Sequence, residues 1–149
     1  MKIAVSSPKH CSLADAVNRH LQEKNLERVL FGALAGRQSD YISAAEELSD
    51  AIAAGHCELG VLFCHTGTGA TLIANKFPGV RAALCPDAFS ARIARGANNA
   101  NVLVLGIRLT GEALAQEIVD GFLEPPAQDQ PKWADFHRRT EEIDQRFRK

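Results

Sequence analysis

The chain has 149 residues, of which 46% are hydrophobic and 23% charged, with a formal net charge of −1. This length fits one domain with a sizeable core, and the balanced charge, without a basic stripe carrying interleaved aromatic residues, argues against nucleic acid as a partner. No apolar run approaches the roughly 20 residues of a membrane span. The first residues turn polar too soon for a signal peptide, so we expect a cytoplasmic protein with no membrane partner.

Apolar runs alternate with segments of helical periodicity along the chain. In chain order we expect a strand at 2–6, a helix at 12–24, a strand at 28–31, a polar loop at 32–40, a helix at 43–54, a strand at 59–63, a helix at 70–76, a strand at 80–84, a helix at 88–97, a strand at 102–105 and a helix at 110–123. Ser12 is an expected helix cap, and Thr110 is expected near the cap of its helix. The strand at 59–63 is continuously apolar, which is typical of strands covered on both faces. The strand at 80–84 is expected to be buried as well.

A polar, proline-containing stretch at 124–131 predicts a linker to a terminal amphipathic helix at 131–148. Five strands separated by helices predict a single α/β domain with a parallel, doubly wound sheet, a Rossmann-like three-layer sandwich. Ligands of such sheets bind outside the carboxyl ends of the strands. This rule selects the turns after the strands, at 7–10, 32–41, 64–69, 85–87 and 106–108.

The four cysteines, at positions 11, 57, 64 and 85, show no C-x-x-C pair and no metal-site spacing with histidine. We therefore expect free thiols and no bound metal. Three of them are predicted to be buried small hydrophobic residues. Cys64 is predicted to be reactive because of the turn that follows it.

That turn reads Cys64-His65-Thr66-Gly67-Thr68-Gly69. Its glycines permit left-handed backbone angles and close approach of a ligand to the main chain. N–H groups gathered at such a turn favour a phosphate, a carboxylate, an oxyanion formed during reaction, or the thiolate form of the cysteine. The pattern is neither a dinucleotide fingerprint nor a Walker loop, and it also suits a tight strand–helix turn around an inert thiol. The residues alone leave both interpretations open.

The turn, together with Ile-Ala-Asn-Lys-Phe-Pro-Gly-Val-Arg-Ala-Ala at 73–83, resembles the C-G-T-G-x-G…A-N-K-x-x-G-I-R-A segment of one family. This is the ribose-5-phosphate isomerase B and galactose-6-phosphate isomerase (RpiB/LacAB) family. Further similarities extend over nearly the whole chain: Asp40-Tyr41 resembles the family's D-Y-P loop, and the segments at 90–91, 98–102 and 106–108 resemble its S-A, N-x-x-N-V and G-x-R segments.

The resemblance implies an RpiB-like fold and an aldose–ketose isomerase that needs no cofactor. In the family, a cysteine thiolate moves a proton between C1 and C2 through an enediolate. By position, Cys64 is the base and Thr66 the assisting hydroxyl, while the turn N–H groups hold the oxyanion. The anion-hole residues are His65, Gly67, Thr68 and Gly69, and the substrate-binding candidates are Lys9, His10, Tyr41, Asn98, Arg108 and Arg139. The resemblance also implies self-association as a homodimer or tetramer, with Asn98 and Arg139 joining the site at a subunit interface.

Three positions depart from the family pattern. The first turn has no Asp-His pair, so Lys9 or His10 is the expected anion-binding cation, unless both are loop charges. His65 replaces a glycine; it is strained if the position requires a positive φ, and it either adds acid–base function or faces solvent. Ala97 stands where the family has its ring-opening histidine, and a methyl group performs no acid–base chemistry. Members that act on D-erythrose 4-phosphate resemble this chain there.

We therefore expect an isomerase for a short or open-chain substrate, such as a tetrose or pentose phosphate or a related sugar acid. Two alternatives remain: a sugar-phosphate-binding relative without activity, and one subunit of a hetero-oligomeric isomerase. Retention of Cys64 and Thr66 favours the enzyme. Tyr41, the one tyrosine of the chain, either closes the pocket or packs as a ring at a loop edge.

Overall fold

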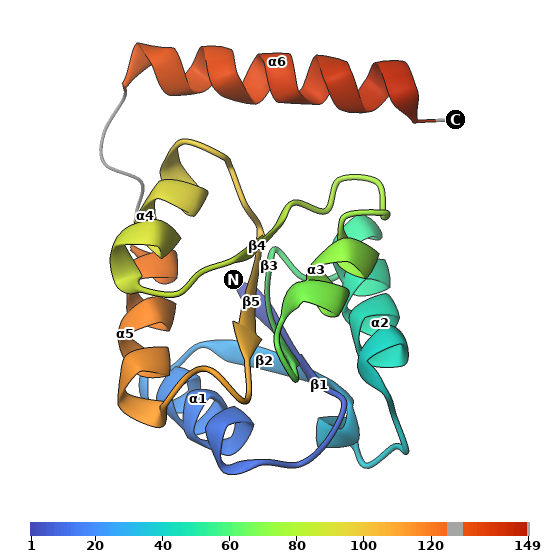
Figure 1. Ribbon diagram of the computed structural model, residues 1–149, viewed down its shortest axis with the longest axis vertical. Helices are drawn as coiled ribbons and strands as arrows, with labels where there is room; N and C mark the ends of the chain where they lie inside the picture. The colour runs from blue at the N-terminus through green and yellow to red at the C-terminus, as the bar shows by residue number, and fades with distance from the viewer. Residues whose placement is uncertain (125–129, 149) are drawn as a thin grey trace.

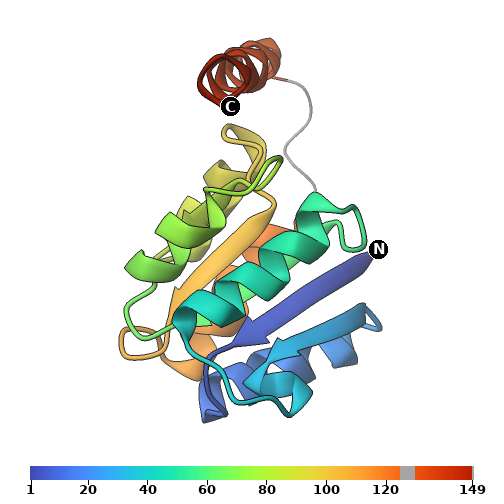
Figure 2. The same ribbon diagram turned by 90° about the vertical axis from the view of Figure 1, so that its right-hand side faces the viewer.

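The computed structural model describes residues 1–124 and 130–148. It contains a five-stranded parallel sheet of order β2-β1-β3-β5-β4 with helices on both faces (Figures 1 and 2). The elements are β1 (Lys2–Ser7), α1 (Ser12–Glu23), β2 (Glu27–Gly32), a short 3-10 helix (Ala33–Ala35), α2 (Tyr41–Ala53), β3 (Leu59–Cys64), α3 (Thr68–Ala74), β4 (Ala82–Leu84), α4 (Ala88–Gly96), β5 (Val102–Gly106), α5 (Glu112–Leu123) and α6 (Pro131–Phe147). The predicted Rossmann-like α/β fold with a C-terminal helix is confirmed. The central part of the predicted linker, 125–129, lies outside the described residues.

Two hydrophobic cores hold the three layers together. Successive strand residues point to opposite faces of a sheet, so Ile3 and Val5 of β1 pack with α1, α4 and α5, whereas Ala4 packs with α2 and α3. β3 pairs with β1 on one side and β5 on the other, and all six of its residues are buried. The prediction that this strand is covered on both faces is confirmed.

β4 differs from its prediction as a buried strand at 80–84. It is only three residues long, pairs with β5 alone and forms the edge of the sheet, with its residues half-buried or exposed. Val80 is buried, but it lies before the strand. A mostly apolar segment indicates that its residues are buried, but it does not indicate where a strand lies in the sheet. The sequence therefore did not distinguish an edge strand from a central one.

The predicted cap Ser12 was wrong, whereas Thr110 lies next to the cap of α5, as predicted. Ser12 is the first residue of α1, and Cys11 is the N-cap, whose Sγ accepts the N–H of Ala14 at 3.5 Å. Thr110 lies outside α5, which has Gly111 as its N-cap. Helices start where an acceptor or the backbone angles allow, and an adjacent serine or threonine does not decide this.

α2 and α3 each begin two residues earlier than predicted. α2 begins at Tyr41 because the carboxylate of Asp40 accepts the N–H of Ser43 at 2.7 Å. α3 begins at Thr68, directly after Gly67. As a result, part of each predicted loop belongs to the first turn of a helix, and both helix starts lie at the carboxyl edge of the sheet.

α6 lies across the opposite, amino edge (Figures 1 and 2). The indole of Trp133 packs against Gly96, the ring of His137 lies 2.7 Å from the Gly96 carbonyl oxygen, and Arg148 donates to the carbonyl of Lys76 at 3.1 Å. Gly96 ends α4 and Lys76 follows α3. In this fold the chain leaves each helix toward the amino end of the next strand, so these contacts place α6 at the amino edge of the sheet. No helix among the described residues is long and apolar enough to cross a membrane.

Candidate active site

A crevice is expected between the carboxyl ends of β1 and β3. These strands are neighbours, with Ser6 paired to Leu62, yet the chain leaves β1 for α1 on one face and β3 for α3 on the other. In open parallel sheets this change of side creates the ligand-binding crevice. The turn at 65–67 follows β3 at this point, and the turn that carries Lys9 and His10 follows β1.

Cys64 is the last residue of β3 and is braced by the turn after β5. The carbonyl of Cys64 accepts the N–H of Ile107 at 2.8 Å, and the carbonyl of His65 accepts the N–H of Arg108 at 3.0 Å. Gly106 makes this approach possible, because a Cβ there would lie 2.8 Å from the backbone oxygen of Thr66. Cys64 is 4% exposed, so a ligand reaches it only over a small part of its surface.

Gly67 and Gly69 meet two different requirements of the turn. Gly67 has φ +88°, a left-handed conformation that favours glycine, and Leu84 occupies the space that a Cβ would need. At Gly69 a Cβ would lie 2.7 Å from the ring of Tyr41. The structure therefore brings Tyr41, half-exposed at the start of α2, directly against the predicted site.

His65 takes its place in the turn without backbone strain. The described residues other than glycine that have positive φ are Asn25 and Asn99, so position 65 does not demand a glycine. The expected strain is absent, and the His65 side chain is exposed.

Two hydroxyls of the turn meet. Oγ1 of Thr66 lies 2.9 Å from Oγ1 of Thr68, across Gly67. One helical turn later, the hydroxyl of Thr71 donates to the carbonyl of Gly67 at 2.7 Å. The side chain of Thr68, predicted only for its backbone N–H, thus belongs to the same group as Thr66.

Exposed basic side chains lie at this edge of the sheet. Lys9, His10 and Arg108 are all exposed, and within residues 1–124 and 130–148 none of them forms an ion pair. Ser7 orders the first turn by donating its hydroxyl to the carbonyl of Lys9 at 2.6 Å. Unpaired cations near a turn rich in N–H groups favour an anionic ligand.

The other thiols lie in different environments. Burial raises the pKa of Cys85 to about 11 and also raises the pKa of Cys57, so both stay protonated near neutral pH. Cys11 is partly exposed, which corrects its prediction as a buried residue. In the described part of the chain, no group of three or more His, Cys, Asp or Glu side chains is arranged to hold a metal ion.

Asn98 and Arg139 are brought together, but not with Cys64. They line one hollow of about 520 Å³ with Ala97 and Ile143, between the loop after α4 and the helix α6. This hollow is at the amino edge of the sheet, whereas Cys64 is at the carboxyl edge. A six-residue strand such as β3 spans about 20 Å, further than a four- to six-carbon sugar phosphate reaches.

Comparisons with known proteins decide the family. The family model described as Ribose/Galactose Isomerase matches residues 3–143. Ribose-5-phosphate isomerase B of Escherichia coli is 39% identical over 104 residues, 70% of each chain. D-erythrulose-4-phosphate isomerase of Pectobacterium atrosepticum is 39% identical over 113 residues, 75% of this chain and 74% of that protein. The structure of ribose-5-phosphate isomerase B from Clostridium thermocellum superposes with a TM-score of 0.88 at 33% identity, covering 99% of both chains.

The chain belongs to the ribose/galactose isomerase family. The resemblance identified from the sequence is confirmed, and with it the expectation of an aldose–ketose isomerase. A third relative, 4-deoxy-4-sulfo-D-erythrose isomerase of a Clostridium strain, is 34% identical over 125 residues, 83% of this chain and 79% of that protein.

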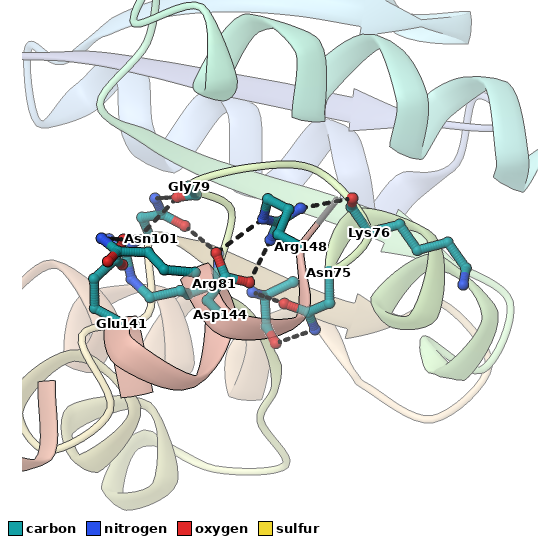
Figure 3. Close-up of polar contacts among 10 residues, drawn as sticks. Asn75, Lys76, Gly79, Arg81, Asn101, Glu141, Asp144 and Arg148 are labelled. Carbon is teal, nitrogen blue, oxygen red and sulfur yellow. Dashed lines mark hydrogen bonds and ion pairs between the residues drawn. The ribbon is translucent and has the colours of Figure 1, made fainter. Parts of the chain in front are cut away.

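Several residues in the segments that resemble the family support the fold away from Cys64 (Figure 3). The amide of Asn75 bonds both backbone groups of Ala82, at 2.8 and 3.0 Å. The amide of Asn101 accepts from the N–H of Arg81 and donates to the carbonyl of Gly79, both at 2.8 Å. In this family member these amides therefore fix the loop before β4, and the short edge strand depends on them. The sequence contains one signal of this role, an asparagine on either side of the Pro78-Gly79 turn.

Proposed function

We propose that this chain isomerises a short aldose phosphate to its ketose by proton transfer at Cys64. One observation carries the proposal: Cys64 ends the central strand at the switch-point crevice, beside a turn of N–H groups and the Thr66 hydroxyl. A thiolate at that position is a suitable general base, and the turn N–H groups are suitable donors to an oxyanion.

The chemistry runs in two proton transfers at carbon and one between the two oxygens. The Cys64 thiolate takes the proton from C2 of the aldose, and the electron pair of that bond forms the enediolate while the C1 carbonyl oxygen becomes the oxyanion. Cys64 then returns its proton to C1, the hydroxyl proton on the C2 oxygen passes to the C1 oxygen, and the carbonyl forms at C2. The backbone N–H groups of His65 to Gly69 stabilise the oxyanion, and Thr66 assists by donating to a substrate oxygen.

A tetrose phosphate is the substrate that fits a site with Ala97 in place of the family's ring-opening histidine. In a tetrose 4-phosphate the oxygen on C4 carries the phosphate, so a furanose ring cannot close and no group is needed to open one. The tetrose-acting relatives support this choice, because their names state an erythrulose phosphate and a sulfo-erythrose as substrates. The exposed basic side chains of Lys9, His10 and Arg108 suit the anionic end of such a molecule.

The complete site is proposed to form between two copies of the chain. Asn98 and Arg139 share a hollow at the edge opposite Cys64, so a second copy is needed to bring them to the first copy's substrate. Large apolar side chains at the carboxyl edge of the sheet support a covered surface there: Leu109 is 67% and Phe89 71% exposed. Whether two or four copies assemble stays a prediction, as does the cytoplasmic location.

A binding protein without activity is the second candidate. It is favoured by the first turn, where Pro8 and Lys9 stand in place of the family's Asp-His pair, and by the deep burial of the Cys64 thiol. Such a protein would bind sugar phosphates without exchanging their protons with solvent.

Proton exchange separates the two candidates. Purified chain in D2O with D-erythrose 4-phosphate is expected to incorporate deuterium and form the ketose, faster than it converts ribose 5-phosphate. Cys64→Ala is expected to lower kcat about 10²–10⁴-fold, the contribution of a general base, with an unchanged thermal unfolding curve. Cys11→Ser is the matched thiol control, because serine preserves the α1 cap.

The outcomes are distinct. Binding of erythrose 4-phosphate by a folded chain, without exchange, would support the second candidate. Faster turnover of ribose 5-phosphate than of any tetrose phosphate would contradict the substrate choice. Near-normal rates in Cys64→Ala would assign the base to another group, with His65 the first to test.

A further inference from the structure

We infer that Thr68 is a positioning residue that orients the Thr66 hydroxyl toward the substrate. This rests on the proposed function, since it concerns the hydroxyl that assists proton transfer. It assigns to the Thr68 side chain a role separate from that of its backbone N–H.

The two hydroxyls form a pair at the exposed start of α3. Their oxygens are 2.9 Å apart, and in the described part of the chain this is the only side-chain hydrogen bond that either hydroxyl makes. A threonine hydroxyl carries one proton and accepts up to two hydrogen bonds. Each partner therefore determines where the other directs its proton.

The backbone fixes the separation of the pair. Gly67, at φ +88°, turns the chain between the two threonines. Its carbonyl is held by the N–H of Thr71 at 3.1 Å and by the Thr71 hydroxyl. On the other side, Gly106 packs against the backbone of Thr66. Both threonines are thus attached to braced main chain, and their hydrogen bond forms without ordering a mobile segment.

The direction of the hydrogen bond determines its effect. When Thr68 donates to Thr66, the single proton of Thr66 is free to donate to the enediolate oxygen. When Thr66 donates instead, its proton is directed at Thr68 and is lost to the substrate. Consecutive hydrogen bonds also polarise one another, so donation by Thr68 makes Thr66 the stronger donor as negative charge develops.

Thr68→Val tests this role with little change of shape, because valine replaces the hydroxyl by a methyl group. With D-erythrose 4-phosphate, we expect kcat to fall about fivefold to tenfold, the effect of one net hydrogen bond. KM is expected to stay within about twofold, because the bond acts in the transition state. Thr68→Ser retains the hydroxyl and is expected to restore kcat to within about twofold.

A double-mutant cycle shows whether Thr68 acts through Thr66. In the Thr66→Val background, Thr68→Val is expected to cause no further loss of kcat, because the hydroxyl that it orients is gone. Thr71→Val is the matched control: it makes the same chemical change one turn later, where the hydroxyl bonds only backbone, and is expected to lower Tm more than kcat.

An active wild type with unchanged kcat in Thr68→Val overturns the inference and leaves the proposed function standing. Equal losses from Thr68→Val in both backgrounds also overturn it, because Thr68 would then act independently of Thr66. A folded wild type that exchanges no proton of any tested sugar phosphate overturns the proposed function and this role together.

Discussion

At the scale of single residues, glycines determine the shape of the active-site turn. Gly67 supplies a left-handed conformation, whereas Gly69 and Gly106 have ordinary angles and are needed because other groups approach them closely. The ring of Tyr41 occupies the space beside Gly69, and the backbone of Thr66 occupies the space beside Gly106. A side chain at position 106 must displace backbone, which yields less easily than a flexible side chain.

Gly106→Ala is therefore expected to harm both stability and activity. Its Cβ would lie 2.8 Å from the Thr66 carbonyl oxygen, so the turn that carries Thr66 must shift. We expect kcat to fall about tenfold or more, because small misplacements of reacting groups cost large factors, and Tm to fall by several degrees. Gly111→Ser is the control, since a Cβ there meets nothing within 4 Å and serine is a good N-cap. A Gly106→Ala enzyme with wild-type kcat would contradict this account of the turn.

At the scale of elements, two aspartates start helices at the carboxyl edge. Asp40 caps α2 and Asp87 caps α4, each through a 2.7 Å hydrogen bond from the N–H three residues later. These hydrogen bonds lower the pKa of both carboxyl groups, with the backbone N–H as the largest cause. The caps hold the first turn of α2, with Tyr41, beside the site, and the first turn of α4, with Phe89, at the same edge of the sheet.

The Asp87 cap predicts a pH-dependent contribution to stability. Since the folded state lowers the pKa of this carboxyl, its charge stabilises the fold above the unfolded pKa, about 4, and this contribution is lost as pH falls through the folded pKa. Asp87→Asn keeps a capping oxygen but does not titrate. We expect thermal unfolding curves of the variant and the wild type to be similar at pH 7, and Tm of the wild type to fall more steeply below about pH 4. Parallel decreases in both proteins would contradict the assignment.

At the scale of the whole molecule, the proposed site is divided between two edges. Cys64, Thr66 and Tyr41 lie at the carboxyl edge, whereas Asn98 and Arg139 line a hollow at the amino edge. Arg139 is part of α6, which lies across that edge (Figures 1 and 2). A single chain cannot bring both groups to one small substrate. Activity is therefore expected to require a second copy.

Complementation between inactive variants tests this arrangement. Cys64→Ala removes the base and Asn98→Ala removes a group from the opposite edge; each alone is expected to be nearly inactive. After unfolding and refolding together in equal amounts, half of the dimers are mixed and each mixed dimer contains one complete site. About a quarter of wild-type activity is then expected. Recovery of no activity, with mixed dimers demonstrated by mass spectrometry, would place both residues in one chain's site or exclude Asn98 from it.

The sequence by itself determined the α/β class, the five strands, the Cys64 turn and the family, because these depend on local signals. Continuous apolar runs located β3 and β5, and paired glycines marked the turn at 65–69. Helix starts were less accurate: the side chain of Asp40 begins α2, and the sequence did not show which of several polar residues would accept an N–H.

Only the tertiary structure decided which of these residues meet. β4 is an edge strand because the connection from β3 through α3 passes the place that β5 later takes beside β3. The packing of Tyr41 on Gly69 depends on how α2 packs against α3. Asn98 and Arg139 line the same hollow, away from Cys64, because of where α6 packs on the domain. Contacts between residues distant in the chain follow from the packing of whole elements, and local patterns of residue type do not encode that packing.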